Sequence, residues 1–251
     1  MIKGDFDYET NGHGYARRRR PDPRIAAMIH SALGNARTVL NVGAGAGSYE
    51  PDDRYVVAVE PSARMRAQRP ATAVPALDAA AEHLPFDDDA FDAVMATVTV
   101  HQWADTARGL AELRRVARGP VVVLTFDGDL LDRFWLAGYV PELVTVERRR
   151  YPPISAIARA IGSETTVLDV PIPIDCVDGF TEAYYARPER FLDPDVRAAQ
   201  SAWGFVDSLA TARAVDRLSG DLASGAWDAR HGHLRGQPTF SGSLRLVVGR
   251  P

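Results

Sequence analysis

The chain has 251 residues, a formal net charge of −4 and 46% hydrophobic residues. This length and apolar content suffice to bury a full core, as one large domain or as one domain with a cap. The small negative charge gives no electrostatic reason to expect a nucleic-acid partner. No apolar run approaches the roughly 20 residues of a membrane span, and the first residues lack the apolar segment of a secretion signal. We therefore expect a cytoplasmic protein that binds neither membranes nor nucleic acids.

Disulfide and metal chemistry find little support in the sequence. Cys176 is the lone cysteine, so it cannot form a disulfide within the chain, and it has no metal-ligand residues at usable spacing. His231 and His233 form an H-x-H pair, but no third ligand is evident. We expect no metal site.

From residue 22 to residue 127 the predicted elements alternate between helix and strand. Asp22-Pro23 is typical of a helix start, with a capping side chain followed by proline at the first helical position. Asp105 caps a second helix that runs to Val116. Apolar and β-branched runs predict strands at 38–42, 55–59, about 73–75, 91–97 and 121–126. Strands that alternate with helices predict a parallel sheet.

The second half of the chain is less regular. Strands are predicted at 165–170 and 243–248, and about seventy residues lie between them, too many for a structureless loop. Helical periodicity is present at 180–185 and 196–206. This insertion is a candidate for a segment that covers a substrate.

Three alternating glycines follow the first predicted strand. Gly43, Gly45 and Gly47 can each adopt a positive φ, and they let a ligand approach the backbone closely. Glu60 ends the next strand, where its carboxylate could accept both hydroxyls of a ribose. The pattern predicts a nucleoside-containing cofactor at the carboxyl edge of the sheet.

The spacing argues against a dinucleotide. That fingerprint needs a third glycine at the start of a long helix, but Ser48 stands there. Only the seven residues Ser48 to Arg54 precede the next strand, which leaves room for about one helical turn. A nucleotide-dependent oxidoreductase is therefore disfavoured.

The glycine loop resembles the G-x-G-x-G loop of class I S-adenosylmethionine-dependent methyltransferases, in their small-molecule, type 11-like branch. Further similar motifs follow in order, over roughly residues 15–127: Glu60-Pro61-Ser62, Ala80 to Phe86 before Phe91-Asp92-Ala93-Val94, and Thr97 to Asp105. The resemblance implies an α/β fold, with a Rossmann-like, doubly wound, seven-stranded sheet that is mostly parallel and has an antiparallel last strand. It also implies S-adenosylmethionine as cofactor.

On this resemblance the chain divides into a core and a helical cap. The cofactor-binding core takes 1–127, 163–174 and 240–251, and the cap takes the insertions 128–162 and 175–239. The positions that match cofactor-binding positions of the family are Tyr15, Arg20, Asn41, Gly43, Gly45, Gly47, Glu60, Pro61, Ala80, Ala81, Glu82, Thr97 and Trp103.

Four of these positions depart from the family pattern or fit a second role. Asn41 replaces the usual acidic residue, and Ala80 replaces a polar one, so their bonds to the cofactor are expected to be weaker or missing. Arg20 could pair with the cofactor carboxylate, but an arginine run is also typical of a solvated face. Trp103 fits a pocket wall or the core equally well.

His101 is the candidate catalytic residue. It follows the fourth strand at the carboxyl edge, and an imidazole can act as a base near neutral pH. The other interpretation is a local hydrogen bond that fixes the loop. The function expected is methyl transfer to a small-molecule acceptor with release of S-adenosylhomocysteine. The alternative is a non-methylating protein of the same fold, either a structural remnant or a sulfonium-assisted cyclase or decarboxylase.

Overall fold

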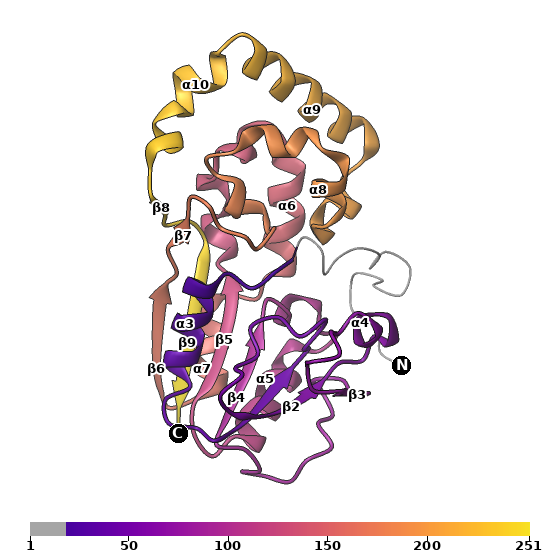
Figure 1. The fold of residues 1–251 in the computed structure, drawn as a ribbon, viewed down its shortest axis with the longest axis vertical. Coiled ribbons are helices and arrows are strands. Elements are labelled where there is room, and N and C mark those ends of the chain that lie inside the picture. Colours follow the sequence, from indigo (N-terminus) through magenta and orange to yellow (C-terminus); the bar gives the residue numbers. More distant parts are fainter. Residues whose placement is uncertain (1–18) are drawn as a thin grey trace.

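The computed structural model describes residues 19–251, in which a seven-stranded sheet has the strand order β3-β2-β1-β4-β5-β9-β6 (Figure 1). The strands in this order are Ala76–Leu77, Tyr55–Val59, Thr38–Val42, Ala93–Thr97, Val121–Phe126, Leu244–Arg250 and Glu164–Asp169. The strands β3, β2, β1, β4 and β5 run parallel, whereas β9 pairs antiparallel with both β5 and β6. The predicted α/β fold with an antiparallel last strand is confirmed. The strand expected at about 73–75 is the short β3, a few residues later.

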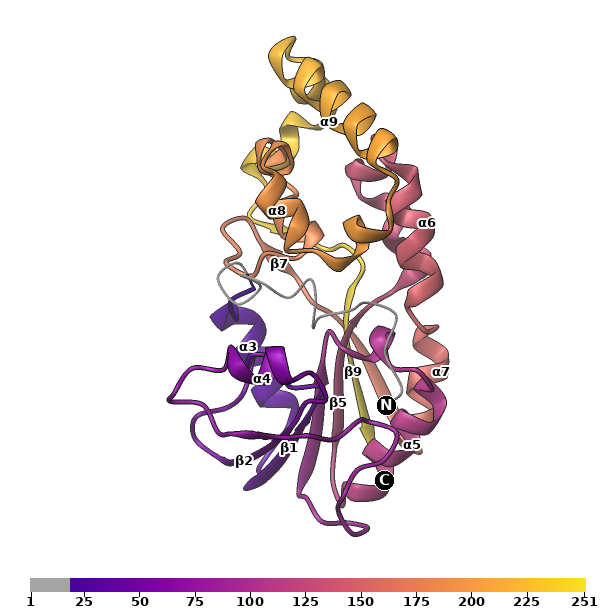
Figure 2. The ribbon, with the colours of Figure 1, turned by 90° about the vertical axis from the view of Figure 1, so that its right-hand side faces the viewer.

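Helices cover both faces of this sheet (Figure 2). Helix α3, Pro23–Ala32, lies on one face, and α5, Thr106–Val116, and α7, Ile154–Ile161, lie on the other. Alternate residues of β5 explain this arrangement, because Val122 and Leu124 pack with the α3 side whereas Val121 and Val123 pack with the α5 and α7 side. The predicted insertion 128–162 therefore contains one helix, α7, that packs with the sheet.

The cap lies beyond the carboxyl edge of the sheet (Figure 1). Its α-helices are α6 Pro141–Arg150, α8 Pro194–Ala198, α9 Ser208–Ala223 and α10 Ala226–His231. Its 3₁₀ helices are η2 Gly128–Arg133, η3 Trp135–Gly138, η4 Thr181–Tyr184, η5 Pro188–Leu192, η6 Ser201–Phe205 and η7 Gly232–Gly236. The helical pattern at 196–206 is thus split between α8 and η6. A two-stranded ribbon of β7, Ile172–Pro173, and β8, Thr239–Phe240, connects the cap to the sheet.

Aromatic packing holds the cap together. The ring of Trp135 contacts the rings of Tyr139, Phe191 and Trp227 at centroid distances of 5.8, 5.7 and 5.4 Å. Trp227 is fully buried, and the indole N–H of Trp135 donates to the carbonyl of Tyr185 at 2.9 Å. Large rings supply the buried area that these short helices could not provide through regular helix packing.

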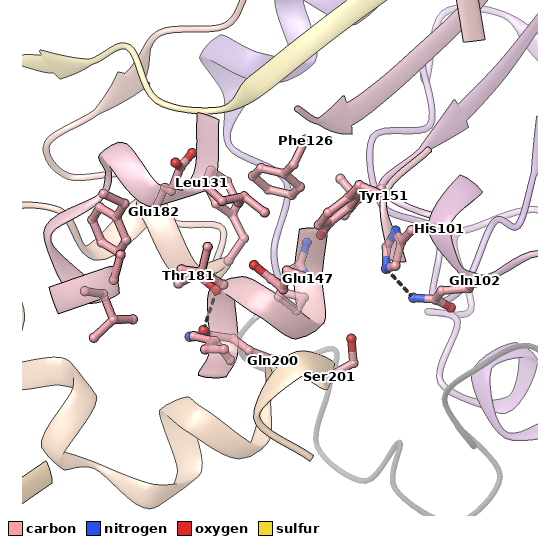
Figure 3. Close-up of a pocket in the computed structure, with 18 residues that line it drawn as sticks. His101, Gln102, Phe126, Leu131, Glu147, Tyr151, Thr181, Glu182, Gln200 and Ser201 are labelled. Atoms are coloured by element: carbon pink, nitrogen blue, oxygen red, sulfur yellow. Dashed lines mark hydrogen bonds between the residues drawn. The ribbon is translucent and has the colours of Figure 1, made fainter. Parts of the chain in front are cut away.

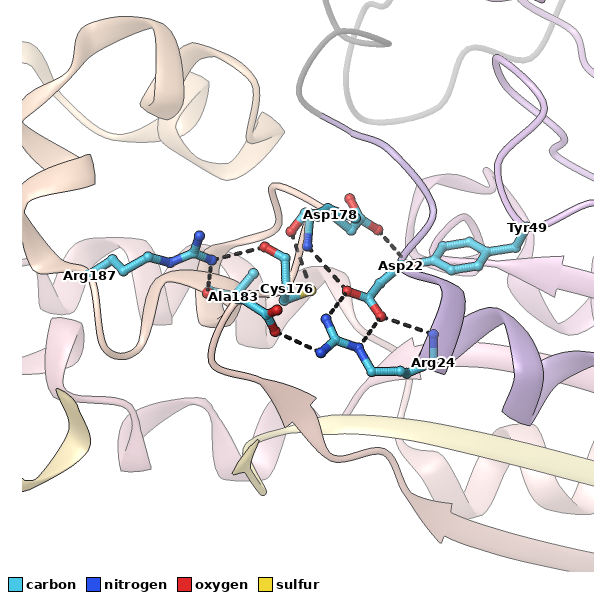
Figure 4. Close-up of polar contacts among 9 residues, drawn as sticks. Asp22, Arg24, Tyr49, Cys176, Asp178, Ala183 and Arg187 are labelled. Atoms are coloured by element: carbon cyan, nitrogen blue, oxygen red, sulfur yellow. Dashed lines mark hydrogen bonds and ion pairs between the residues drawn. The ribbon is translucent and has the colours of Figure 1, made fainter. Parts of the chain in front are cut away.

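Polar contacts join the cap to the core (Figure 4). Asp22, the N-cap of α3, is buried and accepts hydrogen bonds from the backbone and side chain of Arg24 and from the backbone N–H of Val177. Burial alone would raise the pKa of Asp22, but these donors lower it to about 2. Asp178 accepts from the Tyr49 hydroxyl at 2.8 Å and from Arg19 Nε at 2.6 Å. The segment 175–178 is therefore fixed to the core by buried carboxylates.

No helix within residues 19–251 has the length and apolar content needed to cross a membrane.

Candidate active site

The glycine loop after β1 adopts the left-handed backbone that its sequence predicted. The φ angles of Gly43, Gly45 and Gly47 are +67°, +50° and +95°. A Cβ on Gly43 would lie 2.2 Å from the side-chain oxygen of Thr99, whereas one on Gly45 would meet only the end of Met65, at 3.4 Å. Gly43 thus serves a contact inside the protein, whereas among residues 19–251 a side chain on Gly45 would contact the end of Met65 without overlap.

Glu60 lies at the end of β2, beside this loop. Its two carboxylate oxygens accept the backbone N–H groups of Gly45 and Ser62, each at 2.8 Å. Burial raises the pKa of Glu60, and these two hydrogen bonds oppose the rise. Each oxygen keeps a second lone pair, so the carboxylate can accept further hydrogen bonds from a ligand.

Asn41 is buried at the end of β1 and has one unpaired acceptor. Its Nδ2 donates to Glu50 at 3.0 Å, and because a carboxylate only accepts, this bond fixes the orientation of the amide. The Oδ1 atom then has no hydrogen-bond partner among residues 19–251. Glu50 is also paired with Arg69 at 2.8 Å, and Arg69 donates to the carbonyl of Gly45. Sequence reasoning missed Glu50 and Arg69, because they are 19 positions apart and no local pattern indicates the pair.

The remaining predicted cofactor positions lie around the same edge of the sheet. Ala81 and Glu82 are buried, Ala80 and Thr97 are half-buried, and Pro61 is exposed. The Glu82 carboxylate accepts the backbone N–H of Asp105 at 3.1 Å, so it ties its loop to the start of α5.

Trp103 and Arg20 differ in their contacts and exposure. Trp103 packs on α5, where a Cβ on Gly109 would lie 2.5 Å from its ring, which favours the packing role for this residue. Arg20 is exposed, whereas its neighbour Arg19 lines the cavity described next. Tyr15 lies outside the described residues.

A cavity opens beside the ends of β4 and β5 and extends under the cap (Figure 3). Its apolar wall includes Phe126, Leu131, Phe134, Tyr151 and Phe180. Its polar lining comes from Arg19, His101, Gln102, Glu147, Thr181, Glu182, Gln200 and Ser201. Elements far apart in the sequence therefore meet around one space that joins the sheet edge to the cap.

His101 faces this cavity from η1, Val100–Gln102. Its Nε2 lies 3.2 Å from the Gln102 side-chain nitrogen, its ring contacts Tyr151, and its buried Nδ1 has no partner among residues 19–251. Burial, followed by the charges of Arg150 and Arg19, holds the pKa of His101 well below its ordinary value. The imidazole is thus neutral at pH 7.

The segment that carries His101 is strained. Val98 has a φ of +51°, which is an outlier for a β-branched residue, and its side chain lines the cavity. Strain of this kind is often retained at functional sites. The same segment contacts the glycine loop through Thr99, so it lies between the loop and the cavity.

Comparison with known proteins is consistent with this geometry. A family model described as a methyltransferase domain matches residues 40–123. An uncharacterized methyltransferase of Mycobacterium bovis is 41% identical over 113 residues, which cover 42% of this chain and 45% of that protein. The chain therefore matches slightly less than half the length of this curated relative.

Two solved structures extend the likeness to most of the chain. A candidate methyltransferase from an antibiotic biosynthesis pathway of Anabaena variabilis has a TM-score of 0.85 and 28% identity, covering 93% of this chain and 99% of that one. A candidate histamine N-methyltransferase of Thermotoga maritima has a TM-score of 0.59 and 16% identity, covering 97% of each chain, and shows the fold alone. These matches support a class I S-adenosylmethionine-dependent methyltransferase domain in this chain. The cofactor of this class is S-adenosylmethionine.

Proposed function

We propose that this chain transfers a methyl group from S-adenosylmethionine to a small-molecule acceptor bound in the cavity under the cap. One observation carries the proposal, namely that a single segment serves both sites. Thr99 packs against the glycine loop at Gly43, whereas Val98 and His101 line the cavity. A cofactor at the loop and an acceptor in the cavity would thus lie on either side of residues 98–101. In doubly wound sheets ligands bind outside the carboxyl ends of the strands, where both sites lie.

The residues on the loop side fit the cofactor. The Glu60 carboxylate has lone pairs for the ribose hydroxyls, and the buried Oδ1 of Asn41 is an acceptor without a donor in the described chain. Glu50 lies beside Asn41, so a carboxylate is present although the strand itself ends in an amide. Gly45 carries no side chain, so the backbone of the loop is accessible to a ligand there.

The residues on the cavity side would orient the acceptor. When bound, the sulfonium cofactor supplies an activated methyl group, so alignment of the acceptor is the main task left to the protein. The apolar wall excludes water, and His101 offers a neutral imidazole to an acceptor that must lose a proton. The relative from Anabaena variabilis, described with an antibiotic pathway, supports a small organic acceptor.

Titration calorimetry with S-adenosylhomocysteine, followed by an assay of methyl transfer to a panel of small molecules, tests the proposal. We expect saturable binding by the wild type, binding lost in Glu60→Ala, and binding retained in Glu164→Ala, which lies on the exposed edge strand β6. Failure to bind would contradict the cofactor assignment. Binding without methyl transfer to any member of the panel would favour the non-methylating alternative.

A further inference from the structure

One half-buried carboxylate that lines the cavity has no hydrogen-bond partner among residues 19–251. Glu147, on α6, points into the cavity between Thr181 and His101 (Figure 3). No described residue donates a hydrogen bond to its side chain, whereas its backbone carbonyl accepts the N–H of Tyr151. A ligand that fills the cavity would remove the remaining solvent from this carboxylate, so a ligand that donates a hydrogen bond to it is favoured.

The other polar groups around the cavity are already engaged. Glu182 accepts the backbone N–H of Ser243 at 3.1 and 2.9 Å. The hydroxyl of Thr181 donates to Gln200 at 2.7 Å, and Gln200 donates to a backbone carbonyl of α8.

The two arginines near the cavity are engaged as well. Arg19 is bonded to Asp178 at 2.6 Å, and Arg150 donates to Ser201 at 3.1 Å. The buried Nδ1 of His101 and the half-buried carboxylate of Glu147 both line the cavity and lack a hydrogen-bond partner among residues 19–251.

The surroundings of Glu147 restrict the ligand further. Phe126 contacts both Tyr151 and Phe180 at ring-centroid distances of 5.5 Å, so the cavity has aromatic walls. A carboxylate accepts hydrogen bonds and cannot donate them. A ligand that fills this space therefore needs an apolar or aromatic body and a donating group.

We propose that Glu147 recognises the acceptor, by accepting a hydrogen bond from a hydroxyl or amine on an aromatic or apolar small molecule. This inference rests on the proposed function, because the bound molecule is taken to be the methyl acceptor. It assigns Glu147 a binding role, distinct from the role of His101.

The charge state of Glu147 gives the recognition a pH dependence. Burial raises the pKa of Glu147 to about 7, with Glu182 on η4 adding to the rise and Arg150 and Arg19 opposing it. His101, the remaining titratable group that faces it, is neutral. Ionised Glu147 is the stronger acceptor, so affinity for a donor ligand should rise about tenfold from pH 6 to pH 8.

Three probes with one aromatic body test the inference: toluene, benzyl alcohol and benzylamine. Binding to the full chain is followed by NMR with ¹³C-labelled glutamate, and the Glu147 carboxyl signal is assigned by its loss in Glu147→Gln. We expect benzyl alcohol, benzylamine or both to shift this signal and to bind at least tenfold more tightly than toluene. The probe that binds more tightly tells a hydroxyl acceptor from an amine acceptor.

Glu147→Gln should remove both the preference and its pH dependence. Glu142→Gln is the matched control, because Glu142 lies on the same helix but is exposed and paired with Arg213 at the surface. Equal binding of the three probes, no binding of any, or an unchanged preference in Glu147→Gln would each overturn the inference. Thermal unfolding of both variants checks that they are folded.

The same samples separate this inference from the proposed function. Binding of S-adenosylhomocysteine is measured by calorimetry in the wild type and in Glu147→Gln, and we expect it to be equal in both. If it is equal and the probes do not discriminate, the recognition role of Glu147 fails while the cofactor assignment stands. If the wild type binds no S-adenosylhomocysteine, the proposed function fails, whatever the aromatic probes show.

Discussion

The sheet and the cap recognise ligands in different ways. At the sheet edge the candidate cofactor contacts come from the glycine loop and from Glu60, which immediately follow β1 and β2. The cavity is assembled from side chains of η1 at the sheet edge and of η2, α6, η4 and η6 in the cap. A site built around one backbone loop thus uses residues that are close in the sequence. A cavity lined by side chains depends on how distant segments fold together.

The largest effect is expected from removing the carboxylate at the sheet edge. Glu60→Ala should weaken binding of S-adenosylhomocysteine by about 1.5–3 kcal/mol for each lost charged hydrogen bond, and so by about 3–6 kcal/mol if both ribose hydroxyls are bound. Calorimetry measures the dissociation constant. Glu60→Gln, which keeps one acceptor oxygen, should be intermediate. An unchanged constant in a folded Glu60→Ala would remove the assignment.

The second test addresses the segment between the two regions. If His101 is a base, His101→Ala should lower turnover by about 10²–10⁴ and leave cofactor affinity unchanged. Because burial keeps its pKa well below the ordinary value, the wild-type rate should not change with pH near neutrality on account of this group. Stopped assays and calorimetry provide the two readouts. A loss of cofactor binding would make His101 a residue that shapes the loop.

The third test distinguishes the roles of Gly43 and Gly45. Gly43→Ala should destabilise the fold by about 2–5 kcal/mol, because the new Cβ combines a left-handed backbone with overlap against Thr99. Gly45→Ala should destabilise the fold by only about 1–2 kcal/mol, which is the cost of a left-handed backbone at alanine. Its main effect should be weaker cofactor binding. Urea unfolding and calorimetry measure the two effects. Equal stability losses would show that the Thr99 contact is unimportant.

A pH series probes two carboxylates that line the cavity, Glu147 and Glu182. Burial raises the pKa values of Glu147 and Glu182 to about 7, from an ordinary 4.5. A raised folded-state pKa favours folding below about pH 4.5, and this contribution is lost as the pH rises through about 7. Glu147→Gln should therefore gain stability over the wild type between pH 5 and pH 8, by up to about 3 kcal/mol. A constant difference between the two proteins across this range would contradict the prediction.

The smallest effect concerns the contact that joins the two regions. Tyr49→Phe removes the hydroxyl that donates to buried Asp178, which should cost about 1.5–3 kcal/mol. If the contact also positions the cap, protection of cap amides from hydrogen exchange should fall more than that of the sheet. Equal loss in both regions would indicate a purely global effect.

Much of the core could be predicted from the sequence. The strands at 38–42, 55–59 and 121–126 and the helices that begin after Asp22 and Asp105 lie where predicted, because apolar runs and capping residues are local signals. Positive φ at the three glycines follows from the same local chemistry.

Short sequence patterns could not predict the cavity. Arg19 lines the cavity whereas Arg20 is exposed, although the two are identical neighbours in the sequence. Arg19 pairs with Asp178, 159 residues away, which no local pattern indicates. Glu147 lies in a charged stretch that is typical of a solvated helix face, yet in the tertiary structure it lines the cavity. The sequence by itself determined the alternating elements and the glycine loop, since both depend on backbone preferences over a few residues. Only the tertiary structure decided which side chains face the cavity, because burial and pairing depend on residues that the chain brings together over long distances.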